Sequence, residues 1–236
     1  PYAGEFSLGS RFVASMCNLG LLVRARTRGT WRSSLHEYAC LNNWLPSADL
    51  GDAWPREARS WLVSRYLSAF GPASVDDIHW WTGFTKTEAH EAVRDLEASL
   101  VKVRLLDLDG EYLMLSGDLK SLSTYAPVES PHAFYLPGLD PYIMGYRDRR
   151  RFLSPQHRDK VFDRSGNAMP TAWVSGQVVG VWGQRQDGSV VYGLFEAIDE
   201  EERVLLENER DRLSNFLDGE VLPQRSHTPF TRELVK

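Results

Sequence analysis

Residues 135–182 constrain the fold of this chain more than any other stretch. Two prolines and a glycine between residues 137 and 141 exclude a helix there and set a fixed turn around Asp140. Glycine and proline again indicate a turn within residues 166–171, after which apolar positions alternate as in a β-strand. The segment therefore predicts turns followed by a β-hairpin, with the hairpin turning at Ser175-Gly176.

Between these turns lies a basic segment, residues 147–164. It holds seven cationic side chains and three aspartates, a balance of +4, whereas the chain of 236 residues carries −5. Guanidinium groups match the geometry of phosphate oxygens, so this concentration of charge predicts an anionic partner. The arginines cannot all face one way. We expect some to pair with Asp148 or Asp159 and two or three to reach phosphate, and the candidates are Arg147, Arg149, Arg150 and Arg151.

The sequence LPGLDPYIMGYRDRRRFL, followed by SGNAMPT and WVSGQVVGVW, resembles the C-terminal signature of the AlkZ/YcaQ-type winged-helix DNA glycosylases. The resemblance covers most of residues 30–183 and is strongest in residues 135–182. It implies an α+β fold of tandem winged-helix domains with a C-terminal antiparallel β-hairpin or sheet unit. It also implies that the partner is double-stranded DNA, intact or damaged. For a complete chain it implies excision of alkylated or cross-linked bases by hydrolysis of the N-glycosidic bond.

Residues 1–50 follow the order helix, strand, turn, strand, which is the order of a recognition helix and its wing. The chain starts at Pro1 in the middle of this pattern, so we interpret these residues as the C-terminal part of a first winged helix whose beginning lies elsewhere. Five arginines and two glutamates give residues 1–44 a charge of +3. The wing either lies along phosphates or is a solvated hairpin edge protected by charge, and its candidate DNA contacts are Arg24, Arg26, Arg28 and Arg32.

A stretch rich in Pro, Gly and Asp then predicts a domain boundary, and residues 56–118 predict a complete winged helix. Ser74 and Thr85 each stand three residues before an acidic residue, as capping boxes require. The expected elements are helices over residues 56–70, 75–83 and 85–99, then strands over residues 100–106 and 111–115. Helical spacing of apolar residues predicts the inward faces of the first and third helices, which are Ala58, Trp61, Leu62, Tyr66 and Leu67, and Ala89, Ala92, Val93 and Leu96.

In such a module the N-terminus of the third helix can reach base edges, which would involve Thr85, Lys86 and Thr87. Only Lys86 is cationic there, and the rest of the helix is acidic. This balance favours a packing or scaffold role over base readout.

Residues 132–222 predict a C-terminal α+β unit that carries the LPGLDPY turn and the basic segment. Asp187-Gly188 indicates a second hairpin turn. Residues 196–220 hold ten carboxylates and three arginines, a balance of −7, and their apolar residues recur as on a helix. We expect an amphipathic helix that packs on the hairpin and keeps its charged face in solvent. We expect the tail, residues 224–236, to be poorly ordered unless it docks on the rest of the chain.

Catalysis in the family that the chain resembles is associated with a Gln-x-Gln or Gln-x-Asp motif near the N-terminus. The literal match here, Gln184-Arg185-Gln186, lies in the hairpin region, where we interpret it as coincidence. Asp140 either holds a water or orients an arginine, as a catalytic residue would, or bonds its own backbone in an Asx turn. We therefore expect these 236 residues alone to lack turnover. A non-catalytic DNA-binding or regulatory protein and a protein-interaction module are the alternatives.

The remaining patterns exclude several other classes. Six histidines show no metal-ligand spacing and no phosphate-binding loop is present, so we predict neither a metal nor a cofactor. Cys17 and Cys40 are expected to be buried, reduced thiols of a cytoplasmic protein, nucleoid-associated when bound to DNA. No apolar run reaches the roughly 18 residues of a membrane span. Trp80 and Trp81 either stack on an extruded base or belong to the core, which their helical setting favours.

Overall fold

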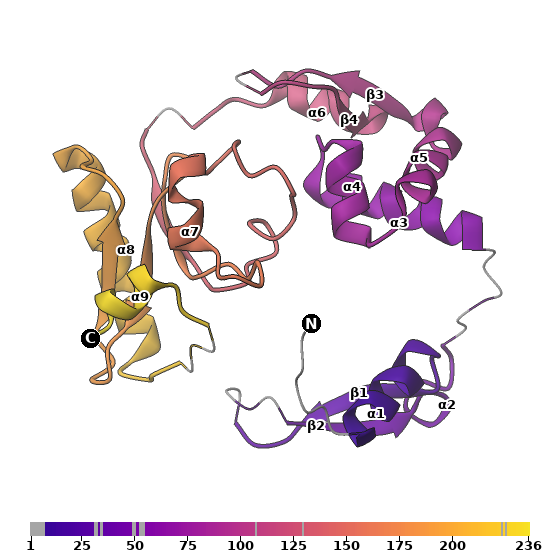
Figure 1. Ribbon diagram of the computed structural model, residues 1–236, viewed down its shortest axis with the longest axis horizontal. Helices are drawn as coiled ribbons and strands as arrows, with labels where there is room; N and C mark the ends of the chain where they lie inside the picture. The colour runs from indigo at the N-terminus through magenta and orange to yellow at the C-terminus, as the bar shows by residue number, and fades with distance from the viewer. Residues whose placement is uncertain are drawn as a thin grey trace. The chain divides into compact units, whose positions relative to one another are not determined.

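The computed structural model describes residues 8–30, 33, 35–48, 51, 55–106, 108–128, 130–222, 224 and 226–236. The chain divides into two compact units, residues 1–54 and residues 55–236. Both units mix helix and strand, and the strands of the described sheets pair antiparallel, which confirms the α+β class (Figure 1). Across these residues no helix is both long and apolar enough to cross a membrane.

The described residues of the first unit begin with a helix and a two-stranded sheet, in the order that the sequence predicts. Strands β1 and β2 are antiparallel, with Leu22 opposite Cys40, and Gly29 adopts φ +89° between them. Helix α1 buries none of its residues. The expected burial of the two thiols is wrong, because Cys40 is exposed and Cys17 is only half-buried. The elements are α1 (Leu8–Asn18), β1 (Leu22–Thr27), β2 (His36–Cys40) and the short α2 (Leu41–Trp44).

The second unit begins with three helices and a hairpin. Both predicted capping boxes form, Ser74 with Asp77 and Thr85 with Glu88, because each side-chain oxygen accepts an N–H that the first helical turn leaves unpaired. The elements are α3 (Pro55–Phe70), α4 (Val75–Thr82), α5 (Lys86–Asp95), the 3₁₀ turn η1 (Glu97–Ser99), β3 (Leu100–Val103) and β4 (Tyr112–Leu115).

The core of these helices follows the predicted apolar stripes, except that Ala58 and Trp61 of α3 are exposed. Tyr66 and Leu67 of α3 are buried together with Ile78 of α4 and Ala89 of α5. Trp61, which was expected on the inner face of α3, is 60% exposed. The link from β4 to the sheet contains η2 (Ser116–Asp118) and α6 (Leu119–Thr124).

The rest of the unit is built on a four-stranded antiparallel sheet in the order β5-β6-β7-β8. Ser175 and Gly176, with φ of 45° and 83°, make the tight turn from β6 to β7 that the sequence predicts. The elements are β5 (Ala133–Leu136), η3 (Pro155–His157), α7 (Arg158–Val161), β6 (Thr171–Val174), β7 (Gln177–Gln184), β8 (Val190–Leu194), α8 (Glu200–Leu217) and α9 (Pro229–Leu234).

The alternation of side chains along β6 separates the two faces of this sheet. Ala172 and Val174 pack with Leu206 of α8 on one face. Helix α8 lies against the sheet, as expected for the acidic amphipathic helix (Figure 1). Trp173 belongs to the opposite cluster, which the residues between β5 and β6 build. The tail docks on this second cluster through Phe230 of α9. The basic segment therefore packs on this second cluster, and its backbone also contacts α4.

Candidate nucleic-acid interface

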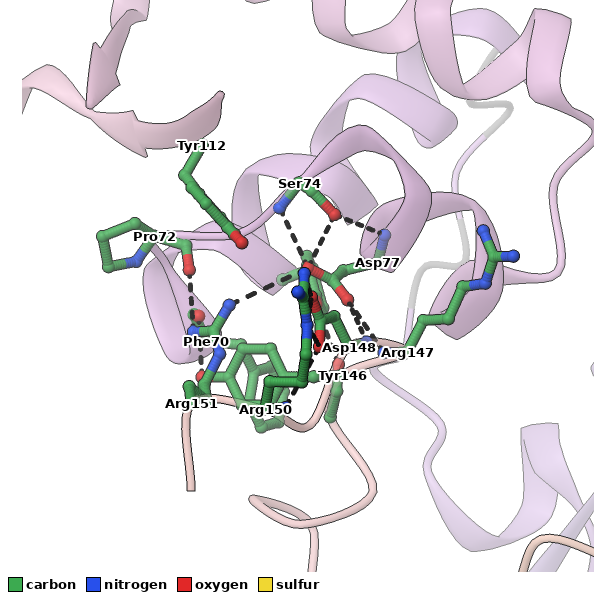
Figure 2. A network of polar contacts seen from close by, with 12 residues as sticks. Phe70, Pro72, Ser74, Asp77, Tyr112, Tyr146, Arg147, Asp148, Arg150 and Arg151 are labelled. Carbon is green, nitrogen blue, oxygen red and sulfur yellow. Dashed lines mark hydrogen bonds and ion pairs between the residues drawn. The ribbon is translucent and has the colours of Figure 1, made fainter. Parts of the chain in front are cut away.

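A single buried carboxylate joins α4 to the basic segment. Asp77 has no exposed surface, and its Oδ2 accepts hydrogen bonds from the N–H (3.0 Å) and Oγ (2.8 Å) of Ser74. Its Oδ1 accepts the backbone N–H groups of Arg147 (2.8 Å) and Asp148 (3.1 Å) (Figure 2). One side chain thus completes a helix cap and fixes the backbone of a segment about 70 residues further along the chain. We call this arrangement the Asp77 joint.

Arg151 lines the same joint from the basic segment (Figure 2). Its Nη1 donates to the carbonyl oxygen of Pro72 (3.0 Å), its Nη2 lies 3.9 Å from Asp77 Oδ2, and its guanidinium lies 3.8 Å from the centre of the Tyr146 ring. Only 12% of this side chain is exposed. The side chain of Arg151 is therefore held inside the protein, and these contacts fix the orientation of its guanidinium group.

Two tyrosine hydroxyls add neutral hydrogen bonds across the joint. Tyr66 of α3 donates to the carbonyl oxygen of Gly145 (2.8 Å), and Tyr146 donates to that of Phe70 (2.9 Å). Burial raises the pKa of both hydroxyls, so they stay protonated donors at neutral pH. Gly145 allows this approach, because a Cβ there would lie 2.7 Å from the Phe70 ring.

Arg147 and Arg150 stay at the surface of the joint. Their side chains are 54% and 47% exposed and pair with Asp76 (2.5 Å) and Asp148 (2.7 Å), respectively. The hydrogen bond from Arg150 lowers the pKa of the Asp148 carboxyl. Pairing of arginine with Asp148 was predicted and is confirmed. Exposed pairs of this kind contribute only about 0–1 kcal/mol, so a phosphate can compete with the carboxylates for both guanidinium groups.

Arg149 has a different environment. Its Cζ lies 4.1 Å from the ring centre of Phe162 and 5.0 Å from that of Trp80, and its Nε is 3.4 Å from the carbonyl oxygen of Ile143. Desolvation, and then the charge of Arg158, lower the pKa of Arg149. Within the described part of the chain, no carboxylate lies within ion-pair distance of this guanidinium.

The other predicted contacts are spread over both units. Thr85 uses its hydroxyl in the cap of α5, with Glu88 Oε2 at 2.9 Å, whereas Lys86 and Thr87 are exposed. In the first unit the side chains of Arg24, Arg26 and Arg28 are exposed, with Arg26 5.4 Å from the ring centre of Trp44 and Arg28 3.2 Å from Glu37. Arg32 lies outside the described residues.

Asp140, the candidate catalytic residue, and Gln184, which begins the literal match to the family motif, both have structural partners. Asp140 Oδ1 accepts the N–H of Tyr142 (2.8 Å), which is the Asx turn that the sequence offered as the alternative. Gln184 accepts the N–H of Leu222 (2.9 Å) and donates to the carbonyl oxygen of Glu220 (2.9 Å), so it holds the chain that follows α8. Among the residues that the structure describes, no group of three or more His, Cys, Asp or Glu side chains could hold a metal ion.

Comparison with known proteins gives three matches. A family model described as "DNA glycosylase AlkZ-like" matches residues 6–216. An interstrand DNA cross-link repair glycosylase from Streptomyces sahachiroi is 28% identical over 148 residues, which cover 58% of this chain and 38% of that protein. The solved structure of the Streptomyces sahachiroi DNA glycosylase AlkZ matches with a TM-score of 0.67 at 24% identity, covering 87% of this chain and 54% of that chain. This chain thus spans about half or less of the length of either relative.

Proposed function

This chain belongs to the AlkZ-like DNA glycosylase family, and on that basis we propose that it binds duplex DNA for the excision of alkylated or cross-linked bases. The reaction is hydrolysis of an N-glycosidic bond, in a repair protein of the cytoplasm. We assign residues 1–50 to the last part of one winged helix, residues 56–118 to a complete one, and residues 132–222 to the α+β unit. The order α3, α4, α5, β3, β4 supports the second assignment.

The Asp77 joint is the observation that carries this proposal. It fixes the backbone of residues 147 and 148 through a buried carboxylate. The backbone that carries Arg147 and Arg150 is therefore held in place, while their guanidinium groups stay exposed. Arg147 pairs with the exposed Asp76 and Arg150 with the half-buried Asp148, and phosphate oxygens can replace carboxylate oxygens at both guanidinium groups. We assign phosphate contacts to these two arginines and a positioning role to the buried Arg151.

Base readout by α5 is not part of the proposal. Thr85 is used in the helix cap, and Glu88 beside it pairs with Arg59 (2.7 Å). The two exposed residues at this end, Lys86 and Thr87, offer a single cation. We infer that α5 serves as scaffold and that the wing arginines 24, 26 and 28 add phosphate contacts.

We also propose that these 236 residues bind DNA without releasing a base on their own. The family's Gln-x-Gln motif has its literal match at residues 184–186, and Gln184 is engaged by the chain after α8. Asp140 is engaged by its own turn. Release of a base from an alkylated duplex by this chain, measured by separating the free base from DNA, would contradict the proposal.

Fluorescence anisotropy tests the DNA contacts. The chain is titrated into a labelled intact duplex and a duplex with an abasic-site analogue, across a salt series. With three to five phosphate contacts, the logarithm of affinity should fall with the logarithm of salt concentration with a slope of about −3 to −5. Arg147→Ala combined with Arg150→Ala should reduce the slope by about two.

The matched control is Arg212→Ala, which removes an exposed arginine paired at 2.7 Å with Glu209 on the acidic helix α8. It should leave the slope unchanged. An equal effect of the control and the double variant would refute the assigned contacts. Absence of binding to either duplex at low salt would refute DNA binding and favour the protein-interaction module.

A further inference from the structure

In the basic segment, Arg149 is a half-buried guanidinium that forms no ion pair with a carboxylate of the described residues. Arg149 is partly withdrawn from water between the rings of Phe162 and Trp80, and its one hydrogen bond, to Ile143, is long at 3.4 Å. Moving a charge out of water without a counterion in contact is unfavourable. The charge of Asp77 offsets this only in part, since desolvation and Arg158 still lower the pKa of Arg149. The Asp77 oxygens already accept hydrogen bonds from Ser74, Arg147 and Asp148. An unpaired, half-buried cation of this kind is suited to an anion that comes from outside.

A second cation lies beside it. The charge of Arg158 acts on Arg149, and its Cζ lies 6.0 Å from the same Phe162 ring. Arg158 is exposed and its one ion pair, with Asp159, is 3.3 Å long at the surface. The two arginines repel each other in the free protein, so an anion placed between them would lower the energy of both.

Trp80 gives this pair of cations an aromatic surface. The guanidinium of Arg149 approaches the Trp80 ring at 5.0 Å, yet 38% of Trp80 remains exposed. Its neighbour Trp81 is oriented differently, toward Tyr66 and Phe70, with ring centres at 5.0 Å and 6.0 Å. Trp80 is therefore a large aromatic side chain that packs only in part against the protein and leaves the rest of its surface exposed.

We propose that Trp80, Arg149 and Arg158 form a binding site for one unpaired nucleotide, whose base stacks on Trp80 and whose phosphate contacts the two guanidinium groups. The site rests on the proposed function, because it assigns part of the DNA contact to a strand that is locally open. Every base in an intact duplex is already stacked on its neighbours, whereas an unpaired or extruded base has a face to offer. The site should therefore distinguish open DNA from fully paired DNA.

Trp80→Leu provides the test. The full chain is titrated against three labelled probes: single-stranded oligothymidylate, a duplex with one unpaired thymine opposite an abasic analogue, and the same duplex fully paired. Loss of one stacked base should weaken binding to the first two probes by about five- to a hundredfold. Binding to the paired duplex should change less than about twofold, and Trp80→Phe should restore most of the lost affinity because it keeps an aromatic face.

The matched control is Trp61→Leu. Trp61 is also an exposed helical tryptophan beside an arginine, with Arg65 5.4 Å from its ring centre, but that arginine is exposed and solvated. It should leave all three affinities unchanged. Arg158→Ala should lower the salt slope for the single strand by about one. Far-UV circular dichroism of each variant confirms that the helices persist.

The outcomes separate this inference from the proposed function. If the chain binds all probes and Trp80→Leu weakens them equally, or weakens none, the stacking site is refuted while DNA binding stands. If the chain binds the single strand through Trp80 but not the duplexes, duplex binding is refuted and the site stands. Failure to bind any probe at low salt refutes both.

Discussion

Asp77→Ala should destabilise the second unit far more than its position in a short helix suggests. The change removes the acceptor of four hydrogen bonds, from the N–H and Oγ of Ser74 and from the N–H groups of Arg147 and Asp148. It also removes the carboxylate nearest to the buried guanidinium of Arg151. Alanine has a side chain that fits the space but accepts no hydrogen bond.

The size of the stability loss can be worked out from the groups that Asp77→Ala leaves without a hydrogen-bond or ion-pair partner. Loss of a helix cap costs about 1 kcal/mol, and each buried donor without a partner costs about 1–3 kcal/mol. Removing one member of a buried ion pair costs about 3–5 kcal/mol. These contributions overlap, since water and small backbone shifts relieve part of each, so we expect the free energy of unfolding to fall by about 3–5 kcal/mol.

Urea unfolding of the full chain, followed by far-UV circular dichroism and tryptophan fluorescence, measures this loss. Asp76→Ala is the control, because it removes the neighbouring carboxylate, which is exposed and pairs with Arg147 at the surface. It should cost about 0–1 kcal/mol. The loss of stability for Asp77→Asn should lie between those two values, because the amide oxygen still accepts the N–H groups of Arg147 and Asp148. If Asp77→Ala costs no more than Asp76→Ala, the joint does not stabilise the fold.

Two further substitutions test other parts of the second unit. Burial acts to raise the pKa of Asp163, but hydrogen bonds, the first from Ser226, lower it to about 2. Since this is below the ordinary value of about 4, the stabilising effect of Asp163 is present above pH 4 and is lost as the pH falls toward 2. Asp163→Asn should therefore lower the thermal midpoint at pH 7 and make no difference near pH 2, and a pH-independent difference would contradict this. Gly180→Ala should cost about 1–3 kcal/mol or more, because its Cβ would lie 2.4 Å from the carbonyl oxygen of Gly193. Gly117→Ala, where a Cβ meets no atom within 4 Å, is the control in the same urea assay.

Features that depend on neighbouring residues could be predicted from the sequence. The capping boxes at Ser74 and Thr85 and the turns at Ser175-Gly176 and Asp187-Gly188 use residue types whose backbone preferences act locally. The family resemblance was also correct, because the matched signature is a long ordered string of residues. These features decide which elements form and where they end.

Features that depend on distant residues could not be predicted in the same way. The cap at Ser74 indicates that Asp77 binds the helix N-terminus, but it does not show that the other oxygen binds residues 147 and 148. Nor does a run of arginines indicate which are buried. Arg151 is enclosed because Pro72 and Tyr146 surround it, and this depends on how two segments pack. The spacing of Trp61 predicted that it lies on the buried face of α3, but it is exposed. Spacing shows which residues share a helix face, and it does not show whether another element covers that face.

Docking of the tail has a consequence for the order in which the chain folds. Phe230 and Leu234 complete the cluster around Ile143, and Thr228 Oγ1 donates to the carbonyl oxygen of Lys160. During synthesis, the cluster cannot close until these residues have left the ribosome, even though the segment it holds emerged long before. The helices α3 to α5 contain their own apolar core and have no such requirement. Released chains truncated before residue 226 should therefore contain a folded helical module and a sheet whose second face is still open to solvent.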